Sequence, residues 1–196
     1  MAQPARSEDR RGALLQAACR VIVRDGAHDL RVEDVAREAG VSPALVYYYF
    51  DTRARLLGDA FGHADSISKN RRAIDESVAG IDQVAQLLLM ELEETPVVRD
   101  NWVMWSEMCA VAVFNSDLRS TVEKAMEEWV GSVERRIRAG KDDGSIRADV
   151  AAKDAAERLT AVVDNLGTKW ILGAMGRERA RRLVRGAIAS ELATGR

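Results

Sequence analysis

The chain has 196 residues, of which 47% are hydrophobic and 31% charged, and its formal net charge is −2. This length and composition fit a globular chain of one or two domains with a substantial core, and they exclude a disordered tail. No uncharged apolar run approaches the roughly 18 residues that a membrane span needs, so we expect a cytoplasmic protein with no membrane partner.

Charge is not evenly distributed along the chain. Residues 1–72 contain 12 Lys and Arg against 10 Asp and Glu, whereas the remainder contains 17 against 21. The excess of positive charge is therefore N-terminal. Because phosphate binding depends on local clusters of basic side chains, a small acidic net charge does not argue against a nucleic-acid binder.

The first two predicted elements are helices. An apolar stripe that includes Leu14, Ala18 and Ile22 predicts a first helix, which ends at the stop signal Asp25-Gly26. Apolar residues then recur at helical spacing over residues 32–39, and Gly40 follows where a left-handed C-cap residue is expected. The second helix is therefore only about two turns long.

A third helix is predicted to begin three residues later. Ser42 offers a side-chain oxygen as N-cap, and Pro43 occupies the first helical position, where its missing N–H costs nothing. Two short helices joined by a turn that contains glycine predict a helix-turn-helix, and the first helix completes its core.

The run VYYYF in the third helix predicts two different faces. At 100° per residue, Val46 and Phe50 fall on one face and should pack against the first two helices. Pro43, Ala44, Tyr47 and Tyr48 fall on the opposite face. A phenol suits a groove lined by phosphates, because its ring is stiff and its O–H donates to a phosphate or a base edge.

A fourth helix is predicted to start after Thr52 as N-cap, with Arg53 in its first turn. An arginine on a helix N-terminus is suited to bind phosphate. With Arg31, which precedes the second helix, these two residues complete the predicted DNA-binding set: Arg31, Ser42, Pro43, Ala44, Tyr47, Tyr48, Thr52 and Arg53.

The segment RVEDVAREAGVSPALVYYYFDTRARLL resembles the DNA-binding segment of the TetR family of transcriptional regulators. It has the Val-Ala pair in the second helix, Ala-Gly-Val-Ser at the turn, Tyr-x-x-Phe in the recognition helix and the following Leu-Leu. Arg31 stands where the family usually has a Thr or Ser cap, which puts a side-chain cap of the second helix in doubt, and Arg53 stands where lysine is usual.

Periodicity predicts further helices over residues 81–92, 102–114, 118–137, 154–175 and 177–192. The segment WVMWSEMCAVAVF, residues 102–114, is apolar nearly all round, so we expect it to be buried on all sides at the centre of a second domain. The chain is thus predicted to be all-α, with a helix-turn-helix domain over residues 1–72 and a larger ligand-binding and dimerisation domain over residues 73–196.

The C-terminal part resembles the BetI-like branch of the family, whose founding type senses choline. The resemblance lies in Trp102 and Trp105, the turn GSIRADV and the segment VVDNLGTKW. The expected ligand pocket is formed by Trp102, Trp105, Glu107, Met108, Val111 and Phe114. We expect its ligand to be a small hydrophobic or cationic amphipathic molecule.

Glu107 leaves two interpretations open. Its neighbours at helical spacing are apolar, and a carboxylate buried without a partner is costly. Either it is hydrogen-bonded or salt-bridged to an Arg or Lys on another helix, or it lines the pocket and binds a cation beside an indole ring.

The TetR resemblance implies a repressor that binds a palindromic double-stranded operator as a homodimer and leaves it when a small-molecule inducer binds. It also implies that the last two helices form a four-helix bundle with a second copy. We expect Leu159, Val163, Leu166, Trp170, Leu183 and Ile188 at that interface.

Two other functions remain open at this point. One is a helical enzyme or small-molecule carrier that uses the apolar C-terminal cavity, and the other is a protein-interaction module that keeps the helix-turn-helix only as structure. Nothing in the sequence has the spacing of a catalytic motif or a metal site, and His28 and His63 lack neighbouring ligands. We therefore expect no enzyme activity, no catalytic or metal-binding residues and no cofactor.

Overall fold

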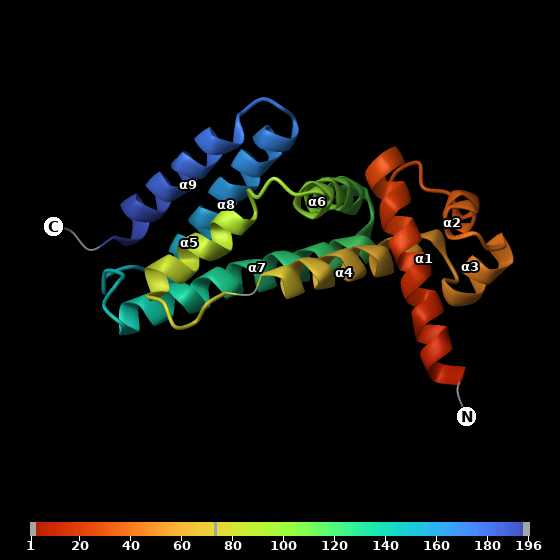
Figure 1. Cartoon of the computed structure of the whole chain (residues 1–196), viewed down its shortest axis with the longest axis horizontal. Coiled ribbons are helices and arrows are strands. Elements are labelled where there is room, and N and C mark those ends of the chain that lie inside the picture. The colour runs from red at the N-terminus through yellow and green to blue at the C-terminus, as the bar shows by residue number, and fades with distance from the viewer. Residues whose placement is uncertain (1–2, 73, 194–196) are drawn as a thin grey trace. The chain divides into compact units, whose positions relative to one another are not determined.

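The computed structural model describes residues 3–72 and 74–193, with the backbone alone for residues 3–7. Within these ranges the secondary structure is helical and contains no β-strand, which confirms the predicted all-α class (Figure 1). The helices are α1 (Gln3–Asp25), α2 (Val32–Ala39), α3 (Pro43–Tyr49), α4 (Arg53–Arg71), α5 (Gly80–Met90), α6 (Pro96–Phe114), α7 (Ser116–Asp142), α8 (Ala152–Ile171) and α9 (Arg177–Leu192). None of the described helices has both the length and the apolar character that a membrane crossing requires.

Two compact units make up the chain. The first comprises residues up to Ser68 together with Val103–Glu123, and the second comprises Lys69–Trp102 and the residues from Lys124 onward. Packing alone defines these units, so the assignment of DNA binding to residues 1–72 and of ligand binding to residues 73–196 stays a prediction.

The first unit contains the helix-turn-helix. In Figure 1, α2 and α3 lie beside α1, and the contacts of α2 with both neighbours hold the three helices together. Val35 of α2 and Val46 and Phe50 at α3 are buried with the apolar stripe of α1. At the edge of this core, Arg11 lies over the Phe50 ring, 5.2 Å from its centroid, and its Nη2 is 2.7 Å from Asp59 Oδ2.

The turn between α2 and α3 has the predicted glycine geometry. Gly40 has φ 67°, a left-handed conformation that favours glycine, and its N–H donates to the carbonyl oxygens at the end of α2. The predicted cap by the Ser42 side chain is wrong, because Ser42 makes no side-chain cap hydrogen bond. The Ser42 carbonyl oxygen instead accepts from the Leu45 N–H at 3.0 Å.

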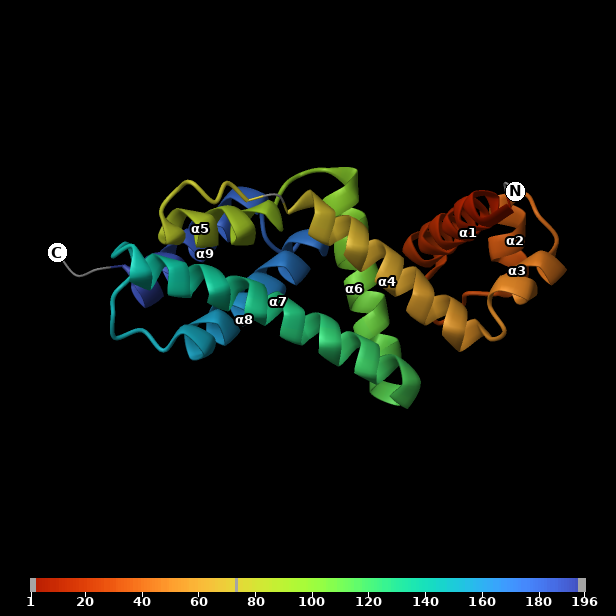
Figure 2. The ribbon, with the colours of Figure 1, turned by 90° about the horizontal axis from the view of Figure 1, so that it is seen from below.

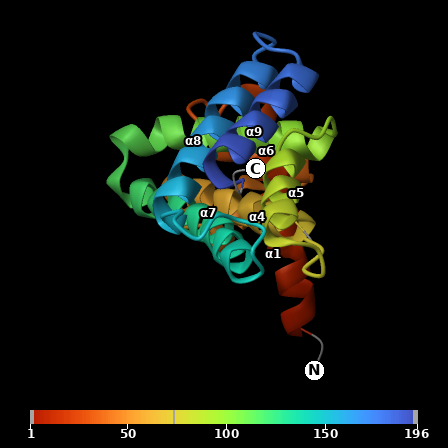
Figure 3. The ribbon, with the colours of Figure 1, turned by 90° about the vertical axis from the view of Figure 1, so that its left-hand side faces the viewer.

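The second unit is organised around α5, α8 and α9. Figures 1 and 3 show α8 and α9 side by side, and α5 packs against α9; Figure 2 shows the same group from below. Trp102 is buried in this unit and packs directly on the backbone of α8 at Gly167, where an added Cβ would lie 2.1 Å from Trp102 Cζ2. The absence of a side chain at Gly167 therefore allows this close approach.

The expectation that residues 102–114 are buried on all sides is wrong. Met104, Met108 and Ala112 of α6 are buried, but the side chain of Val113 is 61% exposed and that of Phe114 is 92% exposed. Within the described residues, the last turn of α6 is therefore exposed to solvent. The prediction failed because the apolar composition of a helix does not determine how many other helices pack against it.

Candidate DNA-binding surface and effector site

The outer face of α3 has the exposure predicted from its sequence. Tyr47 is 48% exposed and Tyr48 is 78% exposed, whereas Val46 and Phe50 are almost completely buried. Ser42, Pro43 and Ala44 are also exposed. The first turn of α3 and its two tyrosines therefore form a surface that the core does not use, which we call the α3 surface.

Thr52 caps α4 as predicted, because its Oγ1 accepts a hydrogen bond from the Arg55 N–H at 3.1 Å. Arg31, before α2, is exposed and makes no side-chain cap hydrogen bond. Both residues flank the α3 surface in sequence, and their contact with DNA stays a prediction.

Arg53 differs from the expectation that its side chain extends toward phosphate. Its Nε donates to the Leu30 carbonyl oxygen at 2.8 Å, and its Nη2 donates to the carbonyl oxygens of Ala27 and His28, each at 2.6 Å. Three of the carbonyls in the α1–α2 turn, residues 26–31, are therefore bound by one guanidinium. This set of acceptors joins residues more than 20 positions apart, so local sequence patterns gave no sign of it.

Glu107 contacts the same turn from α6. Its Oε2 accepts a hydrogen bond from the Ala27 N–H at 2.7 Å, and Gly26 beside it has φ 89°. Of the two interpretations of Glu107, the structure supports a bonded partner, although this partner is a backbone amide and not an Arg or Lys side chain. The α1–α2 turn is thus held by Arg53 through its carbonyls and by Glu107 through an N–H.

The other residues of the expected ligand pocket lie in different surroundings. Trp102 belongs to the second unit, and its Nε1 donates to the Glu91 carbonyl oxygen at 2.7 Å. Trp105 belongs to the first unit and lies 5.9 Å from the Phe61 ring, centroid to centroid. Met108 is buried, Val111 is half-buried and Phe114 is exposed. A common ligand for these residues stays a prediction.

A charged cluster that the sequence did not indicate lies inside the second unit. The Glu91 carboxylate is 4% exposed, and its Oε1 is 2.7 Å from Arg72 Nε and 3.2 Å from Arg71 Nη2. The Arg72 guanidinium also lies over the Trp129 ring of α7, 4.4 Å from its centroid. The Arg72 guanidinium thus contacts both the Glu91 carboxylate and the indole ring of Trp129.

Asp164 of α8 belongs to the same neighbourhood. Loss of hydration, and secondarily the negative charge of Glu91, raise the pKa of Asp164 to about 6, while Arg72 acts in the opposite direction. Among residues 3–72 and 74–193, no hydrogen bond to its carboxylate is found, although its backbone carbonyl accepts one from Thr168. Because this polar position of α8 is surrounded by residues distant in sequence, periodicity did not mark it.

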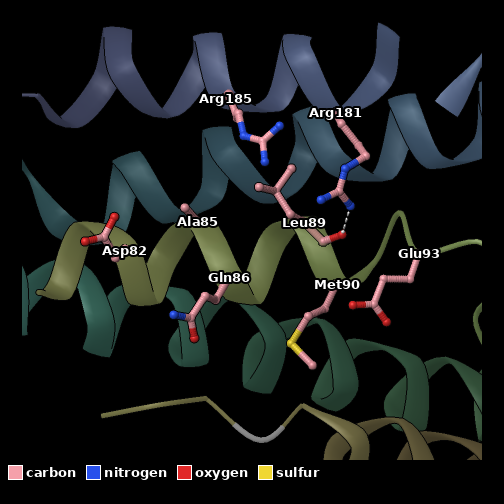
Figure 4. A pocket seen from close by; sticks show the side chains of 8 residues that line it. All are labelled: Asp82, Ala85, Gln86, Leu89, Met90, Glu93, Arg181 and Arg185. Carbon is pink, nitrogen blue, oxygen red and sulfur yellow. Dashed lines mark hydrogen bonds between the residues drawn. The ribbon is translucent and has the colours of Figure 1, made fainter. Parts of the chain in front are cut away.

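A separate groove runs between α5 and α9, with a volume of ≈ 520 Å³. Figure 4 shows Arg181 and Arg185 of α9 on one side and Asp82, Leu89 and Glu93 among the residues on the other. Arg181 Nη1 donates to the Leu89 carbonyl oxygen at 2.9 Å, so this arginine links the two helices. None of the predicted pocket residues lines this groove.

Most of the predicted dimer residues fill the core of their own chain. Leu159, Val163, Leu166, Trp170 and Ile188 are buried, and among the six only Leu183 is exposed, at 44%. The assignment of a dimer interface to α8 and α9 stays a prediction. If these helices do pair with a second copy, the side chains available for that contact are the exposed ones.

The described parts of the chain contain no group of three His, Cys, Asp or Glu side chains arranged to hold a metal ion. In the cluster of the second unit, Glu91 is paired with Arg71 and Arg72, a pattern found both in electrostatic binding sites and in structural ion pairs.

Two family models match the chain. The model described as "Bacterial regulatory proteins, tetR family" matches residues 14–60, which include the helix-turn-helix. The model described as "BetI-type transcriptional repressor, C-terminal" matches residues 80–193.

Similar proteins cover nearly the whole chain. A structure described as a TetR-family transcriptional regulator from Rhodococcus sp. has 31% sequence identity and a TM-score of 0.85, and the match covers 95% of this chain and 100% of that one. A transcriptional regulator from Saccharomonospora viridis, solved in complex with choline, has 26% identity and a TM-score of 0.87, with coverage of 96% and 100%. The HTH-type transcriptional regulator BetI of Brucella melitensis is 25% identical over 167 residues, which are 84% of this chain and 81% of that protein.

Proposed function

Because the chain belongs to the TetR family of transcriptional regulators, a family without enzymatic activity, we propose that it is a repressor that responds to a small molecule. It binds a palindromic operator as a homodimer through residues 1–72. A small-molecule inducer that binds within residues 73–196 lowers its affinity for that operator.

The exposed side chains of α3 carry the proposal for DNA binding. An α-helix fits the major groove of B-DNA, and the N-terminal residues of a recognition helix are those that meet base edges. Tyr47 and Tyr48 present two phenols to solvent while Val46 and Phe50 secure the helix from behind. The Ser42 hydroxyl, which does not cap α3, is a further donor for a phosphate.

A homodimer follows from the symmetry of a palindromic operator, since each half-site receives one recognition helix. We assign the interface to the exposed faces of α8 and α9 and to the turn that connects these two helices. Leu172 and Leu183 are large apolar side chains that remain exposed there, at 74% and 44%. Their burial against a second copy would remove apolar area from water on both chains.

For the inducer we propose an organic cation of the choline class. The support is the related regulator from Saccharomonospora viridis in complex with choline, together with the BetI-type family model over residues 80–193. An inducer of this kind acts by population shift: it binds more tightly to the conformer that fits the operator poorly, and its differential affinity sets the coupling, typically about 1–3 kcal/mol.

The proposal is tested by selecting duplexes from a random library with the full chain, followed by footprinting and sedimentation of the complex. We expect a near-palindromic site, two chains per site, and release of the duplex by an organic cation. Failure to enrich any duplex, or binding of a single chain to an asymmetric site, would contradict the proposed function.

A further inference from the structure

The cluster around Arg72 has the composition of a binding site for an organic cation, and one cation already occupies it. Arg72 follows α4 directly, and its guanidinium contacts both the Glu91 carboxylate, with Nε 2.7 Å from Oε1, and the Trp129 ring, whose centroid is 4.4 Å from Cζ. A cation over an indole face and beside a carboxylate that is 4% exposed gains from both groups.

This site contains more acceptor capacity than Arg72 uses. Glu91 is already shared with Arg71, whose Nη2 lies 3.2 Å away. Asp164 has no hydrogen-bond partner for its carboxylate within residues 3–72 and 74–193, and burial together with Glu91 keeps its pKa raised to about 6. A half-buried carboxyl group that has lost part of its hydration without gaining a hydrogen-bond partner is stabilised in its charged form by an added cation.

The walls of the cluster are built rigidly from three elements. The Trp102 indole is fixed by its Nε1 hydrogen bond to the Glu91 carbonyl oxygen and by its close contact with Gly167, one helical turn after Asp164. Glu91 is therefore held through its backbone as well as its side chain. This arrangement presets the Glu91 carboxylate instead of leaving it to reorganise around a ligand.

We propose that Trp129, Glu91 and Asp164 form a cation box in which Arg72 is a tethered occupant, and that a monovalent organic cation binds by competing with Arg72. This inference rests on the proposed function, because it assigns a site and a ligand class to the inducer. Arg72 lies one residue beyond α4, and its displacement leaves the Glu91 carboxylate shared between the entering cation and Arg71, the last residue of α4.

The competition predicts opposite effects of two substitutions on cation affinity. Arg72→Gln removes the tethered competitor, so the affinity for choline should rise about tenfold. Asp164→Asn removes a charge but keeps the shape, so the affinity should fall about tenfold or more. Arg185→Gln, an exposed arginine of α9, is the matched control and should leave the affinity unchanged.

The experiment is isothermal titration calorimetry of the full chain with choline and with its neutral isostere 3,3-dimethylbutan-1-ol, with thermal unfolding to verify that each variant is folded. A purely structural role for Arg72 would weaken choline binding or leave it unchanged, which overturns the inference. Equal binding of the neutral alcohol, unchanged affinity in Asp164→Asn, or no choline binding by the wild-type and Arg72→Gln chains would overturn it as well.

The two proposals fail separately in these measurements. If a duplex is selected and only neutral compounds release it, the repressor function stands and the cation box does not. If the two variants change choline affinity in opposite directions while no duplex is selected, the cation box stands and the repressor function does not.

Discussion

Replacement of Glu107 by alanine removes the acceptor for the Ala27 N–H in the α1–α2 turn. The bond is 2.7 Å long, and Ala27 is fully buried, so water does not replace the lost carboxylate without local opening. A buried donor left without an acceptor costs roughly 1–3 kcal/mol, and bonds to a charged acceptor lie at the upper end of that range. We therefore expect Glu107→Ala to lower the free energy of unfolding by about 2–3 kcal/mol.

Urea unfolding followed by circular dichroism measures this loss, and amide hydrogen exchange at Ala27 locates it. Glu107→Gln is the matched variant, because a glutamine keeps an acceptor oxygen at nearly the same place. Its cost should stay below about 1 kcal/mol, and the response to an organic cation should be unchanged. Stability of Glu107→Ala within about 0.5 kcal/mol of wild type, with unaltered exchange at Ala27, would refute this role of Glu107.

Three further substitutions test other contacts. Gly167→Ala places a Cβ 2.1 Å from Trp102 Cζ2 and should lower the free energy of unfolding in urea by roughly 1–3 kcal/mol. Gly186→Ala is the control, because nothing lies within 4 Å of its Cβ, and it should leave the stability unchanged or raise it. Equal effects of the two substitutions would contradict the close packing of Trp102 on Gly167. Since the folded-state pKa of Asp164 is raised, its contribution to stability is present below about pH 4 and lost as pH rises through about 6. Asp164→Asn should therefore stabilise the ligand-free chain by up to about 2 kcal/mol at pH 7–8 and have little effect near pH 3, and a pH-independent difference would contradict this. Arg53→Ala should lower the thermal unfolding temperature, because three carbonyl oxygens of the α1–α2 turn lose their hydrogen-bond donor. An unchanged unfolding temperature together with weaker DNA binding would contradict this structural role and favour a direct contact of Arg53 with phosphate.

The sequence predicted the features that depend on local rules. Gly40 as C-cap, Thr52 as N-cap, and the division of α3 into a buried face with Phe50 and an exposed face with Tyr48 all follow from spacing and turn chemistry, and the structure confirms them. The TetR resemblance and its BetI-like branch are confirmed by the family models.

Features that depend on partners far apart in the sequence could not be predicted. Nothing near Arg53 or Glu107 indicates that both bind the α1–α2 turn, because the contacts join positions up to 80 residues apart. Asp164 appears in the sequence as an ordinary polar residue of an amphipathic helix. Its environment depends on how Glu91 and Arg72 pack in the same unit. Likewise, the exposure of Phe114 depends on where neighbouring helices end, which the composition of α6 does not encode.

The most direct test of the central claim is the affinity of Tyr48→Ala for the selected duplex. Phe114→Ala is the control, because Phe114 is an aromatic residue even more exposed than Tyr48, at 92% against 78%, and lies on α6 and not on α3. We expect gel-shift titrations at fixed salt to show at least about tenfold weaker binding by Tyr48→Ala, with unchanged thermal unfolding and sedimentation, and wild-type affinity for Phe114→Ala. Wild-type affinity in Tyr48→Ala, or an equal loss in both variants, would contradict the assignment of DNA binding to the α3 surface.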